Sequence, residues 1–529
     1  MLDQYLLSII LFAPFVGAVI LIFVNGERLT LVRSIAAASS GVSFAASLYL
    51  LYAFRFAPGS AQFQFLQQYE WSKDLGISFF LGVDGISVPL VLASSVLLFA
   101  GVFVSWRIED RAREFYIFLL ILASATIGVY VSLDLFFLYF FYEMSVLPMY
   151  LLLGMWGSHT KGYLETKDTA KRDSVGFIFN FASNSKEYAA MKLTLFLSAG
   201  AVVALLGILL TYVGTGLHTF NLLELQGHEQ QFSPWLRSAI WLLLFFGFAS
   251  IAPLWPMHSW SPVGHAAAPA AVSMLHAGVL MKLGHFSILR VGYWLFPQTT
   301  KEWAFLIAIL CVFSIIYGGL VAFFQRDTKY VIGYSSSSHM GYIFLGMAAM
   351  NMISLSGAVL YMFAHALATG MLFAMAGFVY DQTHTRDIPS LGGLGRKMPF
   401  IMGAFVVALM ASVGLPGTVN FIGELMILAG SWEQYPVQTV IAVIGIAITL
   451  AYLMRMFMGL FLGEMDPKWA HVRDASPVID RLPLVIMISG TLYFGLFPTQ
   501  FIHVISAGVQ PLLEQIHQTG VIASAGGGG

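Results

Sequence analysis

The sequence predicts an all-α polytopic membrane protein with about 14 transmembrane helices, two inverted five-helix repeats and two discontinuous helices. Hydrophobic residues make up 58% of the 529 residues and charged residues only 10%, whereas soluble proteins have about 25% charged residues. The charges gather in short clusters between apolar runs of the roughly 20 residues that a helix needs to cross a bilayer. Two of the runs are broken by proline and glycine.

Apolar runs bounded by charged or turn residues define the predicted spans. The first run follows Asp3 without a basic leader, so we expect a retained span and not a removed signal peptide. Short loops should join the spans, and the tail ending in ASAGGGG should be disordered. The spans lie at 5–24, 30–52, 82–106, 113–132, 134–156, 191–213, 236–262, 267–292, 303–325, 331–350, 354–380, 399–430, 435–462 and 481–500.

Several function classes are excluded by what the chain lacks. Its single cysteine, Cys311, cannot form a disulfide within the chain or hold an iron–sulfur cluster, which needs several thiolates. No CxxC or HExxH spacing suggests a metal site, and the glycine-rich stretches 214–220 and 391–397 do not follow a strand as nucleotide-binding loops do. The net charge of −1 argues against a nucleic-acid partner. We expect no cofactor and no metal on this chain.

The lysines and arginines predict the orientation of the spans. When the loops are numbered alternately, one side holds only Arg55, Lys73, Arg237, Arg290 and Lys301. Lys282 falls inside a span, and the other 20 of the 26 basic residues fall on the opposite side. The positive-inside rule makes that side cytoplasmic, so both termini should be extracytoplasmic and the 157–190 loop cytoplasmic.

Ionisable residues occur deep inside four predicted spans. Glu143, Lys282 and Glu424 each lie ~12–13 Å from a span end at 1.5 Å per residue, and His365 is similarly central. Such residues cost ~2.5–3.5 kcal/mol or more to bury and usually mark ion or proton pathways. A buried lysine can lose its proton when a nearby carboxylate is removed or protonated, so Lys282 is the best candidate for a group that alternates in charge.

A structural alternative exists for these polar residues. Polar side chains also hold membrane helices together by hydrogen bonds, and neutral imidazole is inexpensive to bury. Lone histidines such as His276 and His285 are about as well explained by this role as by proton transfer.

Two spans contain helix breakers in mid-membrane. They are APLWPMHSWSP at 252–262 and GLPGTVNFIG at 414–423. Proline removes a backbone donor and clashes with the preceding turn, so both helices should break, although ordinary kinks are an alternative. The two breaks lie five spans apart, an odd offset, which is typical of inverted repeats. We therefore divide the chain into helices 1–3 (1–112), repeat one with helices 4–8 (113–295), repeat two with helices 9–13 (296–463), and a last helix with the tail (464–529).

Six motifs resemble one family of membrane proteins. They are VDGIS (83–87), FYEMSVLPMY (141–150), PMHSW (256–260), QRDTKYVIGYSSSSHMGY (325–342), THTRDIPSLGGL (383–394) and GLPGTVNFIGELMIL (414–428). They are similar to the antiporter-like membrane subunits of respiratory complex I, NADH-quinone oxidoreductase, and closest to the subunit M family. The resemblance runs from about residue 82 to residue 463.

The resemblance implies a proton-translocating subunit of the membrane arm in the inner membrane, driven by quinone reduction in other subunits. By motif, Glu143, Lys282, His365 and Glu424 match the family's midplane relay, and Lys329 matches a basic residue near the cytoplasmic end. The quinone, flavin and iron–sulfur centres would belong to partner subunits. The expected partners are adjacent antiporter-like subunits, the lipid bilayer and protons.

Three features depart from the family pattern. The family has a lysine two residues before the break proline of helix 7, as ion-pair partner of the helix 5 glutamate, but Ile251 stands there. Glu143 should then be protonated more of the time, unless a neighbouring subunit or water supplies its partner. His276 is also unusual and is a candidate substitute proton site. The 157–190 loop is longer than usual.

Two other functions stay open. An Mrp-type cation/proton antiporter subunit or a membrane-bound hydrogenase subunit would share the inverted repeat, and a paralogue that no longer pumps would explain Ile251.

Overall fold

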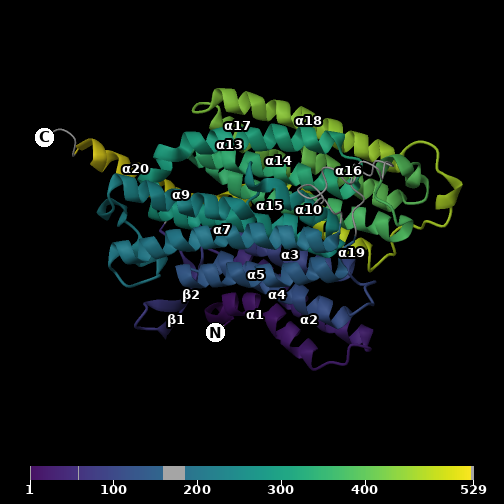
Figure 1. The fold of residues 1–529 in the computed structure, drawn as a ribbon, viewed down its shortest axis with the longest axis horizontal. Coiled ribbons are helices and arrows are strands. Elements are labelled where there is room, and N and C mark those ends of the chain that lie inside the picture. The colour runs from purple at the N-terminus through teal and green to yellow at the C-terminus, as the bar shows by residue number, and fades with distance from the viewer. Residues whose placement is uncertain (1, 58, 159–184, 526–529) are drawn as a thin grey trace, which may run out of the picture.

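The computed structural model describes residues 2–57, 59–158 and 185–525. Figure 1 shows a bundle whose helices run along its long axis, so its loops gather at two ends. The hairpin face is the end with the two β-strands, on the left. The basic face is the opposite end, where loops 105–111, 384–398 and 462–480 lie. Contacts such as Arg107 with Asp480 and the Phe400 amide with Asp474 join these loops.

The chain begins with α1 (Leu2–Ile22) and α2 (Leu29–Ala53), and α3 (Ser87–Val104) follows after a hairpin of β1 (Gln64–Ser72) and β2 (Ile77–Val83). The antiparallel strands pair with Gln67 opposite Leu81. The predicted helical fold is confirmed, and this hairpin is an addition to it, because only a short loop was predicted here. Aromatic and polar residues alternate over residues 68–72 in the second half of the first strand, and this strand signal is not detected when only long apolar runs are sought.

Next come α4 (Ala112–Val131), α5 (Leu135–Trp156), α7 (Lys186–Thr215), the short α8 (Leu222–Leu225) and α9 (Pro234–Ile251). The predicted 157–190 loop ends earlier than expected, because α7 already begins at Lys186. Most of that loop lies outside the described residues. The predicted break after α9 is confirmed, since helical structure resumes only in a 3-10 turn (Met257–Ser259) and in α10 (Trp260–Ala267).

The span after this break contains two π-helical turns. It consists of α11 (Ala270–Leu275), η4 (His276–Leu280), α12 (Met281–Ser287) and η5 (Ile288–Tyr293). Residues 271–293 of this span are all buried inside the molecule. π-helical turns are rare in proteins, and many of those that are found lie at functional sites.

The second half of the chain continues with α13 (Pro297–Phe324), α14 (Thr328–Ala348) and α15 (Met352–Thr383). Like the π-containing span, α15 is surrounded by other helices, and its residues 354–379 are all buried. The second predicted break is also confirmed, because α16 (Pro399–Val413) and α17 (Val419–Ser431) are separate helices with Gly414 left-handed between them, at φ 73°.

The chain closes with α18 (Pro436–Phe461), α19 (Arg481–Leu496) and α20 (Thr499–Ala525), which extends toward the hairpin face in Figure 1. The expected disordered tail is therefore helical as far as Ala525. Its apolar side packs on the bundle, as the burial of Val504, Val509 and Ile516 shows.

In the described part of the chain, 11 helices are long and apolar enough to cross a membrane, or 12 if the bent pair α19–α20 is one span. Two further predicted spans coincide with α14 and with the pair α16–α17. Every predicted span thus contains a helix or a broken helix, while the count of fourteen crossings and the repeat boundaries stay predictions. Cys311 is free and buried.

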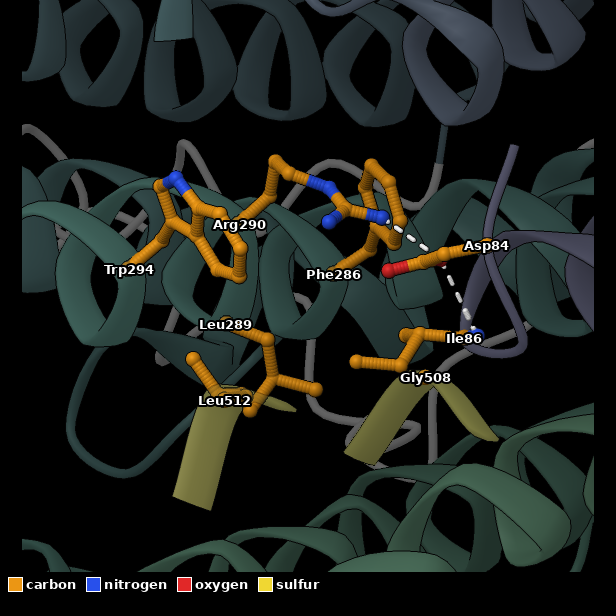
Figure 2. Close-up of a pocket in the computed structure, with 8 residues that line it drawn as sticks. All are labelled: Asp84, Ile86, Phe286, Leu289, Arg290, Trp294, Gly508 and Leu512. Carbon is orange, nitrogen blue, oxygen red and sulfur yellow. Dashed lines mark hydrogen bonds and ion pairs between the residues drawn. The ribbon is translucent and has the colours of Figure 1, made fainter. Parts of the chain in front are cut away.

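A buried ion pair ties the hairpin face together. Asp84 Oδ1 lies 2.7 Å from the Arg290 guanidinium, and the two side chains are 0% and 3% exposed. The same carboxylate accepts hydrogen bonds from the amides of Ile86 and Ser87 at the start of α3. Figure 2 shows Gly508 and Leu512 of α20 closing the pocket around the pair. The pocket is too narrow for a water molecule, so the pair is a dry contact joining α3 to η5.

Candidate functional site

The two central buried helices meet through Lys282 and His365. Lys282 Nζ lies 2.7 Å from His365 Nδ1 and also donates a hydrogen bond to the Ala277 carbonyl in the π turn η4. The Thr369 hydroxyl lies 3.2 Å from the same ring nitrogen. An ammonium group has no lone pair, so only one of the two basic groups holds the shared proton. This contact is suited to passing a proton between α12 and α15.

More imidazoles surround this contact. The His339 ring lies 5.3 Å from the His365 ring, centroid to centroid. His285, one turn after Lys282, packs on Phe344 at 4.3 Å and has its Nε2 buried without a hydrogen-bond partner. The charge of Lys282 acts on both of these histidines. Sequence reasoning missed His339, although it lies within the quoted SSSSHMGY motif.

His276 is part of a stack of rings between the broken helix and the π turn. Its ring lies 5.1 Å from Trp260 and 4.1 Å from His265, both in α10, and His265 packs in turn on Phe373 of α15 at 5.0 Å. His276 is fully buried, yet neither ring nitrogen has a hydrogen-bond partner. Since buried polar atoms are nearly always paired, these nitrogens are positioned to bind a proton or a water molecule.

Glu424 lies beside the second helix break. It is 5% exposed, and its Oε2 lies over Gly414, where a Cβ would be only 2.0 Å away. Its charge acts on the phenols of Tyr342 and Tyr361, which face it from α14 and α15. The absence of a side chain at residue 414 therefore makes the space that this carboxylate occupies.

Glu143 differs from the other deep groups because it lies at the outside of the bundle. It is half-buried, and Phe140, Leu147 and Tyr150 on the same side of α5 are 46%, 63% and 37% exposed. Its carboxylate accepts a hydrogen bond of 3.3 Å from the Tyr139 hydroxyl. Among the described residues, no ion pair includes it.

Ile251 is fully buried at the end of α9. The ring of Tyr142, the neighbour of Glu143, packs on Phe248 one turn earlier. Ile251, at the position where the family has a lysine, is thus close to the inward side of α5, but its side chain is apolar.

Lys329 lies toward the basic face and holds the end of the broken helix. Its Nζ donates a 2.5 Å hydrogen bond to the Ala268 carbonyl, and Arg386 donates to the Ala266 carbonyl. Arg386 also pairs with Asp327 at 3.0 Å. Burial raises the pKa of the Asp327 carboxyl, while the positive charge of Arg386 opposes that rise. The Lys329 amine and the Arg386 guanidinium thus donate to backbone carbonyls at the C-terminal end of α10, and a helix dipole favours positive charge there.

The structure therefore brings Lys282 and His365 into direct contact and places His276 within the surrounding imidazole cluster. Glu143, Glu424 and Lys329 form no hydrogen bond with that pair. They lie at the outside of α5, at the second break and near the basic face respectively.

Comparison with known proteins gives one consistent family. A family model described as NADH:quinone oxidoreductase/Mrp antiporter, TM matches residues 175–449. The chain is 33% identical to NADH-quinone oxidoreductase subunit M of Rickettsia prowazekii over 97% of this chain and 99% of that protein.

Solved structures show the same fold. A chain of respiratory complex I from Thermus thermophilus with bound NADH superposes with a TM-score of 0.83 at 24% identity, over 96% of this chain and 99% of that chain. A chain of the Mrp complex from Dietzia superposes with a TM-score of 0.80 at 18% identity, over 98% of this chain and 99% of that chain. At such identities the likeness concerns the fold alone.

Proposed function

Because the chain belongs to the NADH-quinone oxidoreductase subunit M family, we propose that it translocates protons in the membrane arm of a complex I-type enzyme through Lys282 and His365. The observation that carries this proposal is the 2.7 Å contact between their nitrogens within the buried parts of two helices. Energy would come from quinone reduction in partner subunits, and this chain would hold no redox centre.

The proton transfer follows from the chemistry of the contact. When Lys282 is an ammonium group, His365 Nδ1 is the acceptor, and transfer leaves a neutral amine and an imidazolium. Neither charge is solvated by bulk water, because the two residues are 0% and 2% exposed. A change of charge nearby therefore shifts the position of the proton strongly, since interactions between charges are larger at low dielectric.

The other deep groups extend this pair into a relay. On one side, the charge of Lys282 acts on His276 and on His265 of α10, whose rings lie 4.1 Å apart. On the other side, His339 and Tyr361 lie between His365 and the Glu424 region. Glu143 would be the group nearest to a neighbouring antiporter-like subunit, because its side of α5 is exposed in the isolated chain.

In this proposal the basic face is cytoplasmic and the hairpin face, with both termini, is extracytoplasmic. The distribution of 20 basic residues against 5 supports this orientation in an inner membrane. A cysteine introduced at Glu109, an exposed residue of the basic face, should react with impermeant reagents only from the cytoplasmic side of sealed vesicles. Reaction from the outside would reverse the orientation.

A second candidate is a subunit of an Mrp-type cation/proton antiporter, favoured by the matching family model, whose description names the Mrp antiporter beside NADH:quinone oxidoreductase. The two functions differ in their driving reaction. A complex I-type subunit needs NADH and quinone for proton movement, whereas an antiporter moves protons in response to a sodium gradient.

The deciding experiment uses the assembled complex in sealed vesicles, with proton translocation followed by a pH-sensitive dye. NADH-driven translocation that Lys282→Ala abolishes is the expected result. Translocation driven only by a sodium gradient would favour the antiporter, and normal NADH-driven translocation by Lys282→Ala would refute the relay.

A further inference from the structure

A hollow at the basic face lies apart from the imidazole cluster. Its volume is about 300 Å³, and it lies between the loop after α3, the end of α15 and the loop before α19. Charged side chains line it, among them Arg107, Asp381, Arg473, Asp474 and Asp480. It is large enough for several water molecules, each of which takes ~30 Å³ of liquid volume.

Two of the three carboxylates in this hollow accept hydrogen bonds from other groups of the protein. Asp474 accepts hydrogen bonds from the amides of Phe400 and Ala475. Asp480 pairs with Arg107 at 2.7 Å and accepts from the Ser476 amide at 2.8 Å. Both carboxylates hold the loops of the basic face in place.

Asp381 is the third carboxylate and is exposed in the hollow. Among the described residues, neither a hydrogen bond nor an ion pair is found for its side chain. The charged groups around it are Arg107, Asp480, His384 and Lys329, each close enough for its charge to act on Asp381. Asp381 is thus a carboxylate of the hollow whose oxygens remain open to proton exchange with water.

The buried Lys329 is one of the groups whose charge acts on this carboxylate. One turn before Asp381, Gly377 packs so closely on Ala270 that a Cβ would lie 2.4 Å from the alanine Cβ. Lys329 Nζ bonds to the carbonyl of Ala268, two residues earlier in the same segment. The segment from Ala268 to Ala270 therefore contacts α15 one turn before the water-exposed carboxylate and also holds the amine of a lysine that is only 3% exposed.

Lys329 in turn adjoins the imidazole cluster. Gly333, one turn further along α14, packs against Pro262 and His265, with 3.5 Å from its Cβ position to the His265 Cβ. The charge of Lys329 acts on His265, whose ring lies against His276. Asp327 and Arg386 are the other charged groups that face Lys329.

We propose that Asp381 takes up protons from water in this hollow and passes them to Lys329 on the way to Lys282. This role of Asp381 rests on the proposed translocation function. In the first step, a proton from water binds a carboxylate oxygen of Asp381. In the second step, that O–H bond breaks and an N–H bond forms on the neutral amine of Lys329. No electron is transferred, and the carboxylate is regenerated for the next proton.

The test compares Asp381→Asn with Asp381→Glu and with the control Glu109→Gln, which removes an exposed carboxylate of the same face outside the hollow. NADH-driven translocation is measured in vesicles holding the complete complex. Asp381→Asn should slow translocation about tenfold or more, since loss of a positioned proton-transfer group typically costs ~10²–10⁴-fold in that step. Asp381→Glu and Glu109→Gln should stay within about twofold of the unmodified complex.

A second measurement separates proton uptake from a structural role. The NADH:quinone turnover of Asp381→Asn in detergent should recover when millimolar formate is added, because the hollow admits a small weak acid. Formate should not rescue Lys329→Gln, whose position is buried. If the Asn variant does not assemble, Asp381→Ser takes its place in both assays.

The proposal is overturned if Asp381→Asn translocates at the normal rate, or if its loss is neither restored by Glu nor rescued by formate. Lys282→Ala is measured beside it. Normal translocation by Lys282→Ala would refute the relay itself, whereas its loss alongside a normal Asp381→Asn would refute only the uptake site.

Discussion

Lys282 and His365 come from different helices, 83 residues apart, and their nitrogens lie 2.7 Å from each other at 0% and 2% exposure. The contact depends on the π turns on either side of α12 and on a histidine in the middle of α15. Because both helices are enclosed by the bundle, neither side chain can reach solvent by changing rotamer. The pair must therefore exchange protons with other buried groups.

Replacing Lys282 by alanine should abolish NADH-driven proton translocation in an assembled complex. His365 would lose its proton donor, and no other lysine contacts it among the described residues. Translocation is measured by dye quenching in sealed vesicles, and Lys301→Ala, an exposed lysine of the hairpin face, is the matched control. Equal quenching by the two variants would contradict the assignment.

A lysine introduced at Ile251 should pair with Glu143. Tyr142 packs against α9 one turn before Ile251, so a flexible lysine there can reach the adjacent carboxylate. We expect Ile251→Lys to increase the share of Glu143 that is in the carboxylate form and to shift the pH dependence of turnover. Infrared difference spectra would show this as loss of a carboxylic C=O band, with Glu143→Gln used to assign it. If the unmodified protein lacks that band, another cation already pairs with Glu143.

The buried pair of Asp84 and Arg290 should matter much more for stability than the exposed pair of Arg107 and Asp480. Asp84→Asn leaves the Arg290 guanidinium buried without a counter-charge, which costs ~3–5 kcal/mol. Asp480→Asn acts on a pair whose arginine is 51% exposed, and surface pairs contribute ~0–1 kcal/mol. Thermal denaturation of the purified complex in detergent checks the difference. A loss of the same size in both variants would show that the buried pair has no special role.

Much of the fold was predictable because apolar runs and helix breakers are local signals. The broken helices after α9 and α16 follow directly from their prolines and glycines, and the deep positions of Lys282 and His365 follow from counting residues. The contact between the two was not predictable, because it depends on how α12 and α15 rotate within the bundle.

The sequence also could not predict that the side of α5 carrying Glu143 faces outward. Depth along a helix can be counted from a span end, but which side faces outward depends on the neighbouring helices. Apolar residues lie on all sides of α5, so the sequence does not indicate which side faces outward. Counting residues from the span ends therefore placed Glu143 and Lys282 at the same depth, although Glu143 is half-buried and Lys282 is fully buried.

Gly414, whose backbone is left-handed, allows a selective test of whether proton translocation depends on the position of the Glu424 carboxylate. In Gly414→Ala the new Cβ would lie 2.0 Å from Glu424 Oε2, so the carboxylate must move. Gly417→Ala is the matched control, because Gly417 also has a positive φ, 95°, but nothing lies within 4 Å of its Cβ position. Both variants should lose ~1–2 kcal/mol of stability from the left-handed backbone. Only Gly414→Ala should also lower the rate of NADH-driven translocation per assembled complex, measured in sealed vesicles. A similar decrease in both variants would mean that backbone strain at the break, and not the position of Glu424, limits translocation.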